Sequence, residues 1–119
     1  MKLQLQVSKQ DFYRKYYQAI NGILKLTNKE LVILTALSNK KYKLNLNDKD
    51  LFSSTSRSEV SQILGISKFN FNNYIKSMRD RSILLKSNNI TSINPSIYKD
   101  ITSTDSLDFK FTFNIHESN

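Results

Sequence analysis

The sequence predicts a mainly helical protein with one small β-ribbon, an α+β fold in a single domain. Apolar residues recur at helical spacing in four stretches of the 119-residue chain, and each stretch follows a Ser or Thr that suits a helix N-terminus. Two short apolar runs flank a polar Ser-Asn-Asn segment, which is the pattern of a β-hairpin. We therefore expect residues 1–119 to form an N-terminal helical extension (1–26), a core (27–98) and an acidic tail with a strand (99–119).

The N-terminal extension is expected to contain one helix after Ser8. The apolar residues of this helix share one face at helical spacing: Phe12, Tyr16, Ile20, Ile23 and Leu24. Tyr13 and Tyr17 flank that face, and Asn21-Gly22 is a place where the helix is prone to end early. This apolar surface exceeds what a small core requires, so we expect it to pack partly on the domain and partly on a second copy of the chain.

A capping box at Thr27–Glu30 predicts the start of the second helix. Its buried stripe is expected to consist of Leu31, Leu34 and Leu37, widened by Val32 and Ile33. The helix is expected to end near Ser38-Asn39. Apolar and polar residues then alternate over 42–46, which predicts a short strand, and residues 50–52 suit a brief helical turn.

Residues 56–85 predict two further helices joined by a tight turn. A second capping box at Ser56–Glu59 opens the shorter helix, whose inward residues are expected to be Val60, Ile63 and Leu64. Gly65 suits the positive φ of a tight turn, and Ser67 is placed to cap the next helix. That helix shows the spacing of a buried stripe: Phe71, Tyr74, Ile75 and Met78.

The β-ribbon is predicted from residues 83–93. One strand is expected at 83–85, a turn at Ser87-Asn88-Asn89 and a return strand at 90–93. Pro95 has no amide to donate, so the pairing should end there. Alternation of apolar and polar residues over 107–113 predicts one more strand near the C-terminus.

Residues 59–68 resemble the helix-turn-helix signature. That signature has a small residue in its first helix, here Ser61, a glycine four positions later, here Gly65, and a capping serine, here Ser67. With the ribbon that follows, residues 27–98 resemble a winged helix-turn-helix, although Ser82 stands where that family usually has glycine. The resemblance implies binding of double-stranded DNA with no catalytic site.

The segment Asn94-Pro95-Ser96-Ile97-Tyr98 is similar to the Asn-Pro-x-x-aromatic ending of phage and plasmid replication or regulatory proteins, including the RepL type. This second resemblance implies a transcription regulator of phage or mobile-element type, or a replication-associated factor. Either function fits a bacterial or phage-infected cytoplasm, which we expect as the location.

The winged-helix resemblance implies that the helix opening at Ser67 contacts DNA. Its face away from the buried stripe is expected to present Lys68, Phe69, Asn70, Asn72, Asn73, Lys76 and Arg79. Asparagine binds the N6/N7 edge of adenine, lysine reaches guanine or phosphate, and Phe69 suits a thymine methyl. The free amides behind Ser67, with Arg57 nearby, suit phosphate oxygens. At the ribbon tip, Lys86, Asn88 and Asn89 are expected to follow the DNA backbone or the minor groove.

Other interpretations of these residues stay open. Phe69 equally suits packing against the ribbon or against a second copy. The asparagines and lysines are also what an AT-rich genome would supply on any surface. His116 is the only histidine and has no second ligand in sight, so no metal is expected. With no cysteine, no phosphate-binding glycine loop and no suitable carboxylate pair, we expect neither an enzyme nor a cofactor.

The charge of the chain favours a polyanionic partner. The net charge is +8, but residues from 100 onward hold one Lys and four acids, so the basic body ends in an acidic strip. No apolar run is long enough to cross a membrane, and the alternating N-terminus differs from a secretory signal. We expect duplex DNA as partner and a homodimer formed through the N-terminal helix, the C-terminal strand or both.

The alternative function is a protein-contact module within a larger assembly, such as a phage particle or a polymerase complex, because winged folds are reused in this way. The acidic tail is compatible with it. RNA binding has less support, since no aromatic platform on a sheet is recognisable in the sequence.

Overall fold

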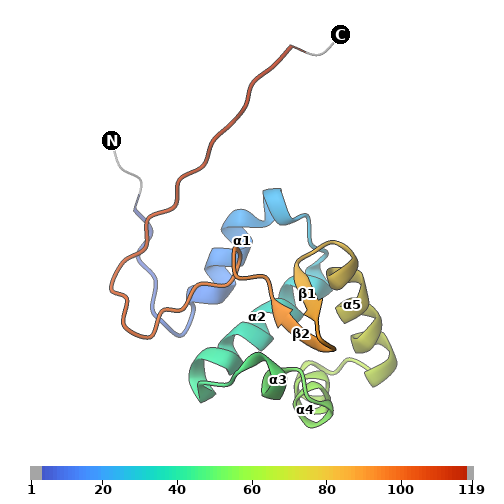
Figure 1. Cartoon of the computed structure of the whole chain (residues 1–119). Helices are drawn as coiled ribbons and strands as arrows, with labels where there is room; N and C mark the ends of the chain where they lie inside the picture. The colour runs from blue at the N-terminus through green and yellow to red at the C-terminus, as the bar shows by residue number, and fades with distance from the viewer. Residues whose placement is uncertain (1–3, 118–119) are drawn as a thin grey trace.

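The computed structural model describes residues 4–117, which form helices and one two-stranded antiparallel sheet (Figure 1). The elements are α1 (Phe12–Leu24), α2 (Asn28–Leu44), α3 (Asp48–Leu51), α4 (Ser54–Leu64), α5 (Lys68–Asp80), β1 (Leu84–Ser87) and β2 (Ile90–Ile93). The predicted mainly helical α+β class is confirmed. The first three residues of the predicted extension and the last two of the predicted tail lie outside the described residues.

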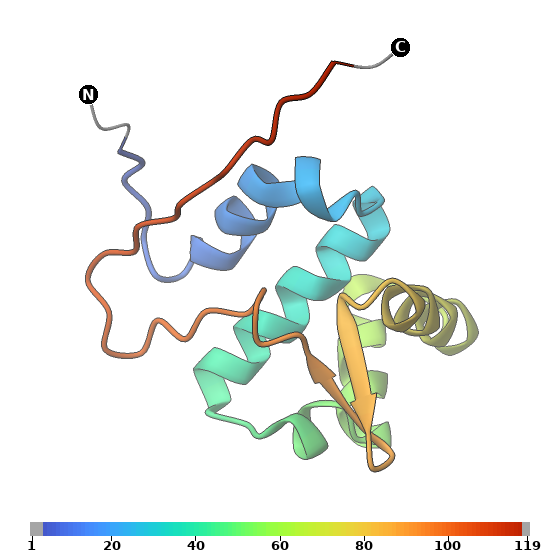
Figure 2. The same cartoon turned by 45° about the horizontal axis from the view of Figure 1, so that its top comes forward.

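A single hydrophobic core joins the elements, and α2 lies at its centre. Helix α1 packs on α2, while α4 and α5 pack on α2 and on each other, as Figures 1 and 2 show. The short helix α3 lies along β2, and β1 packs on α5. Fully buried residues from these elements meet in one cluster: Tyr13, Tyr17, Ile33, Leu34, Leu37, Leu51, Phe71, Met78 and Leu84.

The buried face of α1 is centred on three tyrosines rather than on the predicted stripe. Tyr13, Tyr16 and Tyr17 are buried, whereas Ile23, part of the apolar face expected to be shared between the domain and a second copy, is 66% exposed in the single chain. Each phenol finds a hydrogen-bond partner, which removes the penalty for burying it: Tyr13 donates to the Lys99 carbonyl at 2.6 Å and Tyr16 to the Ile97 carbonyl at 2.7 Å. The helix also continues past Asn21-Gly22 to Leu24.

Helix α2 begins at its predicted capping box but is longer than expected. The Thr27 hydroxyl accepts the Glu30 N–H at 3.2 Å, and Glu30 Oε1 accepts the Thr27 N–H at 3.0 Å. The helix does not end at Ser38-Asn39, because the Ser38 hydroxyl is satisfied inside the core by the Tyr17 phenol at 2.7 Å. The strand predicted over 42–46 is therefore wrong: most of it is the last turn of α2, which Asn45 ends in a left-handed conformation with φ 50°.

Helix α4 begins three residues before its predicted start. Ser53, not Ser56, is the N-cap, and its hydroxyl accepts the Ser56 N–H at 3.2 Å. Ser56 itself is buried, and Ile63 is 82% exposed although it was expected to point inward. The earlier start places Val60 and Ser61 on the buried face, so the small residue of the helix-turn-helix pattern does lie inside.

Two helices end in the same way, once with glycine and once with serine. After α4, the N–H groups of Gly65 and Ile66 donate to the carbonyls of Gln62 and Ser61, and Gly65 has φ 67°. After α5, the N–H groups of Ser82 and Ile83 donate to Arg79 and Met78 in the same arrangement, and Ser82 has φ 62°. Both are Schellman motifs, in which the residue just past the helix is left-handed.

The two motifs predict opposite effects of substitution. Gly65→Ala should lower the free energy of unfolding by about 1 kcal/mol, because the open space around a Cβ at Gly65 leaves only the cost of a left-handed alanine. Ser82→Gly should raise it by about 0.5 kcal/mol, since glycine removes the strain at φ 62°. Urea denaturation of both variants is the measurement, and a destabilised Ser82→Gly would show that the serine side chain compensates for its backbone.

The β-hairpin forms as predicted, with strand ends shifted by one or two residues. Leu84 pairs with Ile93 and Ser87 with Ile90, so Ser87 belongs to β1 and the turn contains only Asn88 and Asn89. These asparagines have φ 51° and 62°, the two positive values that a type I′ turn requires. Asparagine tolerates this conformation better than most residues, so the local sequence explains the turn.

The Asn-Pro-x-x-aromatic segment forms a corner that returns the chain to α1. The Asn94 side chain donates to the Ser82 carbonyl at 2.9 Å and accepts the Ser96 N–H at 2.9 Å. The Asn94 carbonyl accepts the Tyr98 N–H at 3.0 Å, and the Tyr98 ring stacks on Tyr13 with centroids 5.4 Å apart. This segment thus joins the ribbon to the N-terminal helix.

The strand predicted over 107–113, and with it the C-terminal strand of the tail, is wrong. Within residues 4–117 the only strands are β1 and β2, and the segment after Thr102 passes α1 and ends as an extended chain away from the helices (Figures 1 and 2). Phe109 stacks on Tyr16 at 5.0 Å, but Phe111, Phe113 and Ile115 are 52%, 84% and 93% exposed. A strand needs a hydrogen-bonded neighbour, and the folded monomer offers none here.

Candidate functional site

Helix α5 is held firmly at its N-terminus and along its inner face. The Ser67 hydroxyl accepts the Asn70 N–H at 3.1 Å, so the predicted cap is confirmed. Phe71, Ile75 and Met78 are buried in the core. The backbone of α5 is therefore positioned by packing on one side, which leaves the other side free for contact.

The outer face of α5 carries a short row of exposed residues. Phe69, Asn73 and Lys76 follow each other at i, i+4 and i+7, which places them on one side of the helix, and all three are exposed. Lys68 and Asn70 are exposed beside them in the first turn. The row ends at the exposed Asp80, so the face without negative charge covers the first two turns.

Phe69 does not pack against the ribbon, which was one of its three expected contacts. Its side chain is 75% exposed and makes no aromatic contact with any described residue. Single exposed apolar residues are common on protein surfaces, but Phe69 lies in one row with Asn73 and Lys76. The remaining interpretations are contact with a ligand or with a second copy.

Asn72 does not belong to this outer row, although the sequence predicted it there. It is half-buried, and its Oδ1 accepts a hydrogen bond from Nη1 of Arg57 at 3.1 Å. Arg57 comes from α4, so this bond links α4 to α5. Arg57 Nε is buried and has no hydrogen-bond partner among the described residues.

A cleft of about 260 Å³ lies between α5 and the ribbon, with α3 and α4 at its base. Five of the predicted site residues line it: Arg57, Asn72, Arg79, Lys86 and Asn89. The cleft also contains Lys49 of α3, which the sequence did not identify. Phe52, Ile75 and Ile90 supply its apolar lining. The remaining predicted residue, Asn88, is exposed at the ribbon tip.

The opposite flank of α5 has a second, more open depression of about 440 Å³. Asn70, Asn73 and Tyr74 line it from α5, and Thr27 and Glu30 line it from α2. Unlike the first cleft, this depression contains a carboxylate. The two flanks of α5 therefore differ in charge.

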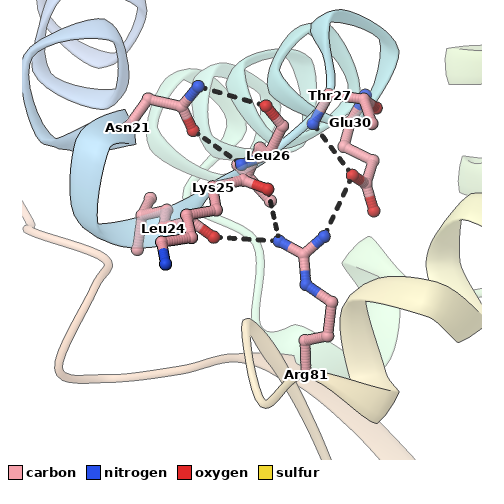
Figure 3. A network of polar contacts seen from close by, with 7 residues as sticks. All are labelled: Asn21, Leu24, Lys25, Leu26, Thr27, Glu30 and Arg81. Atoms are coloured by element: carbon pink, nitrogen blue, oxygen red, sulfur yellow. Dashed lines mark hydrogen bonds and ion pairs between the residues drawn. The ribbon is translucent and has the colours of Figure 1, made fainter.

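The C-terminal end of α5 is joined to the α1–α2 connection by Arg81 (Figure 3). Its Nη1 contacts Glu30 Oε1 at 3.3 Å, and its Nη2 donates to the carbonyls of Leu24 and Lys25 at 2.9 and 3.0 Å. The Asn21 side chain closes the same connection through two hydrogen bonds to the backbone of Leu26. Both ends of α5 are thus fixed, the first by Ser67 and the last by this network.

The Glu30 carboxyl is ionised within this network. Burial favours the neutral form, but hydrogen bonding to Thr27 and the Arg81 guanidinium outweigh it and hold the pKa of Glu30 below its ordinary value. Because Glu30 is only 2% exposed, its charge is compensated by contacts within the protein rather than by water.

Comparison of the chain with family models, with curated proteins and with solved structures found no significant match. Among residues 4–117, no three His, Cys, Asp or Glu side chains come close enough together to hold a metal ion. No helix in that range has the length and apolar character needed to cross a membrane.

Proposed function

We propose that this protein binds double-stranded DNA sequence-specifically, on a winged helix-turn-helix scaffold in which α4 and α5 form the helix-turn-helix and the β-ribbon is the wing. The observation that carries the proposal is the outer row of α5, where Phe69, Asn73 and Lys76 are exposed on a helix fixed at both ends. We propose a role as a transcription regulator of phage or mobile-element type, or as a replication-associated factor.

The dimensions of the outer row suit the major groove. From Phe69 to Lys76 the helix rises about 10 Å at 1.5 Å per residue, which matches about three base pairs at 3.4 Å each. An asparagine can bind the adenine edge with two hydrogen bonds, and an aromatic or aliphatic group can contact a thymine methyl. Asn73 and Phe69 supply these two contacts, which favours A·T pairs, and Lys68 and Lys76 supply contacts to guanine or phosphate.

Binding to a random-sequence duplex across a salt series tests the proposal. The affinity of the wild-type protein should fall steeply with salt, because each neutralised phosphate contributes about −0.9 to the slope of log K against log salt concentration. The Lys68→Ala/Asn73→Ala/Lys76→Ala variant should bind at least ~10-fold more weakly, with a slope shallower by up to about 2. Lys15→Ala/Lys99→Ala removes the same charge on the α1 side and should change little. A wild-type protein without measurable duplex binding would overturn the proposal.

We propose that the protein is a homodimer, formed on the side of α1. Figures 1 and 2 show the N-terminal and C-terminal segments on that side, away from α5 and the ribbon. Helix α1 and the two terminal segments carry exposed apolar side chains: Leu5, Ile23, Phe111, Phe113 and Ile115. A second copy would cover them and remove this apolar surface from water. Such a dimer would leave both α5 helices free.

Light scattering at micromolar concentration tests the dimer. The wild-type protein should have twice the mass of one chain, and Phe111→Ser/Phe113→Ser should shift it to the monomer, since these side chains are 52% and 84% exposed in the single chain. Thr112→Ala, in the same exposed segment, is the matched control and should leave the mass unchanged. A wild-type monomer would contradict the dimer without bearing on DNA binding.

One observation favours a second candidate function, a protein-contact module within a larger assembly. The exposed phenylalanines after Leu107 form an apolar segment that a different protein could also bind. The salt series separates the candidates, because a protein-contact module has no reason to bind duplex DNA with a steep salt dependence.

A further inference from the structure

The cleft between α5 and the ribbon concentrates positive charge from four separate elements. Lys49 comes from α3, Arg57 from α4, Arg79 from α5 and Lys86 from β1. No Asp or Glu lines the cleft. None of the four cations takes part in an ion pair with any residue from 4 to 117, where the pairs involve Arg14, Lys40, Lys41 and Arg81 instead.

Gathering these four cations in one cleft works against folding, and a bound anion would offset that repulsion. Like charges gathered in one concave site repel each other, and the apolar walls weaken the screening by water. What sets the four cleft cations apart is that they line one cleft that no carboxylate lines, so the ligand that fits them is an anion.

Arg57 is the best positioned of the four. Its Nη1 donates to Asn72 Oδ1 at 3.1 Å, which restrains the guanidinium, and its Nε is a buried donor without a partner among the described residues. A guanidinium fixed in this way suits the oxygens of a phosphate, which it binds through two parallel hydrogen bonds. Asn72 would then act through Arg57 rather than by reading a base.

The size and lining of the cleft favour a sugar-phosphate over a bare ion. One water molecule occupies about 30 Å³ of liquid, so the cleft, at about 260 Å³, has room for much more than one phosphate group. Ile90 is 41% exposed at its edge and Phe52 lies at its base, so apolar surface accompanies the cations. A nucleic-acid strand offers the same combination, a phosphate joined to a sugar with an apolar face.

We propose that this cleft binds one sugar-phosphate unit of a DNA strand, with Lys49, Arg57, Arg79 and Lys86 around the phosphate and Asn72 as the residue that positions Arg57. The inference rests on the proposed function. It assigns the two sides of α5 different tasks: the outer row contacts base edges, and the cleft side holds the backbone that passes between α5 and the ribbon.

Salt-dependent duplex binding of cleft variants tests the proposal. Lys49→Ala/Arg79→Ala should weaken binding to every duplex sequence alike and make the slope of log K against log salt shallower by about 2. Lys15→Ala/Lys99→Ala, with the same loss of charge, should keep the wild-type slope. If the wild-type protein binds duplex DNA and the cleft variant keeps its slope, the cleft proposal is wrong while the proposed function stands. If the wild-type protein binds no duplex, both are wrong.

The role of Asn72 is tested by a double-variant comparison. Asn72→Ala and Arg57→Ala should each make the slope shallower by about 1, and the double variant should do no more than either, because both act on one phosphate contact. Selected binding sites should keep the wild-type motif in Asn72→Ala. A changed base preference would show that Asn72 reads a base.

Thermal unfolding experiments identify the source of the phosphate. They compare the effect of duplex DNA with that of inorganic phosphate and that of a short single-stranded oligonucleotide. Duplex DNA should raise the melting temperature of the wild-type protein more than the same phosphate concentration of either, and Lys49→Ala/Arg79→Ala should reduce that rise. A rise with inorganic phosphate alone, lost in the cleft variant, would overturn the assignment to DNA and show a site for a free anion.

Discussion

Replacing Tyr13 by alanine should lower the free energy of unfolding by about 4 kcal/mol, the typical loss when a buried aromatic residue is removed from a core. Tyr13 is fully buried, lies between Tyr17 and Tyr98 with ring centroids 6.1 and 5.4 Å away, and donates to the Lys99 carbonyl. Burial raises the pKa of Tyr13 well above its ordinary value, so the phenol remains a donor throughout the neutral range. The loss is measured by urea denaturation at pH 7.

Tyr13→Phe is the matched control for this substitution. It keeps the ring and removes only the hydrogen bond to Lys99, so the expected loss is about 1 kcal/mol. A loss of that small size in Tyr13→Ala as well would contradict the account, since it would mean that α1 is an appendage and not part of the shared core.

Replacing Glu30 by alanine should lower the free energy of unfolding by about 3 kcal/mol. The substitution removes the acceptor of the capping box and leaves the partly buried Arg81 guanidinium without its carboxylate. Glu30→Gln keeps an acceptor for the Thr27 N–H but removes the charge, so about half of that loss is expected. Equal losses in the two variants would show that the charge of Glu30 is irrelevant and that capping accounts for the effect.

The stability that the Glu30–Arg81 ion pair gives to the fold depends on pH in a defined way. The folded-state pKa of Glu30 lies below its ordinary value of 4.5, so its ionised form stabilises the fold above pH 4.5 and this contribution is lost as the pH falls through the folded pKa. The difference in unfolding free energy between the wild-type protein and Glu30→Gln should be constant from pH 7 to about 5 and shrink below 4.5. A difference as large at pH 3 as at pH 7 would contradict the ion pair as its source.

The features that the sequence predicted correctly depend on neighbouring residues. The caps at Thr27 and Ser67 need a partner three residues away, and the turn at Asn88-Asn89 needs only its own two residues. The buried stripe of α5 also follows from helical spacing alone. Each of these is a local arrangement, so the chain pattern is sufficient to identify it.

The incorrect predictions concern features that depend on tertiary contacts. Five residues over 42–46 are too few to separate a strand from a helical turn, and the burial of Ser38 against Tyr17 decides for the helix. Val32 and Ile63, both expected to be buried, are 44% and 82% exposed because the rotation of α2 and α4 about their axes is set by what these helices pack on. The alternation over 107–113 indicates a strand, but a strand also requires a neighbour from another part of the fold.

In the candidate site, too, local features could be predicted from the sequence and features set by tertiary contacts could not. The outer row of α5 could be predicted because it lies opposite a recognisable buried stripe. The cleft could not, since it brings Lys49 beside Lys86 and Asn89, far along the chain. The inward turn of Asn72 likewise depends on Arg57, fifteen residues earlier. Charge alone did not mark Lys49 among the 18 Lys and Arg residues of the chain.

Selection of bound sequences from a random duplex pool tests the central claim, sequence-specific DNA binding by the outer row of α5, most directly. The wild-type protein should enrich a short motif with A·T pairs at its centre, and Asn73→Ala should lose the preference at one or two adjacent positions while the rest of the motif remains. Lys49→Ala/Arg79→Ala should recover the wild-type motif at lower salt. A pool that stays random after selection with the wild-type protein, or a motif that Asn73→Ala leaves unchanged, would contradict the account.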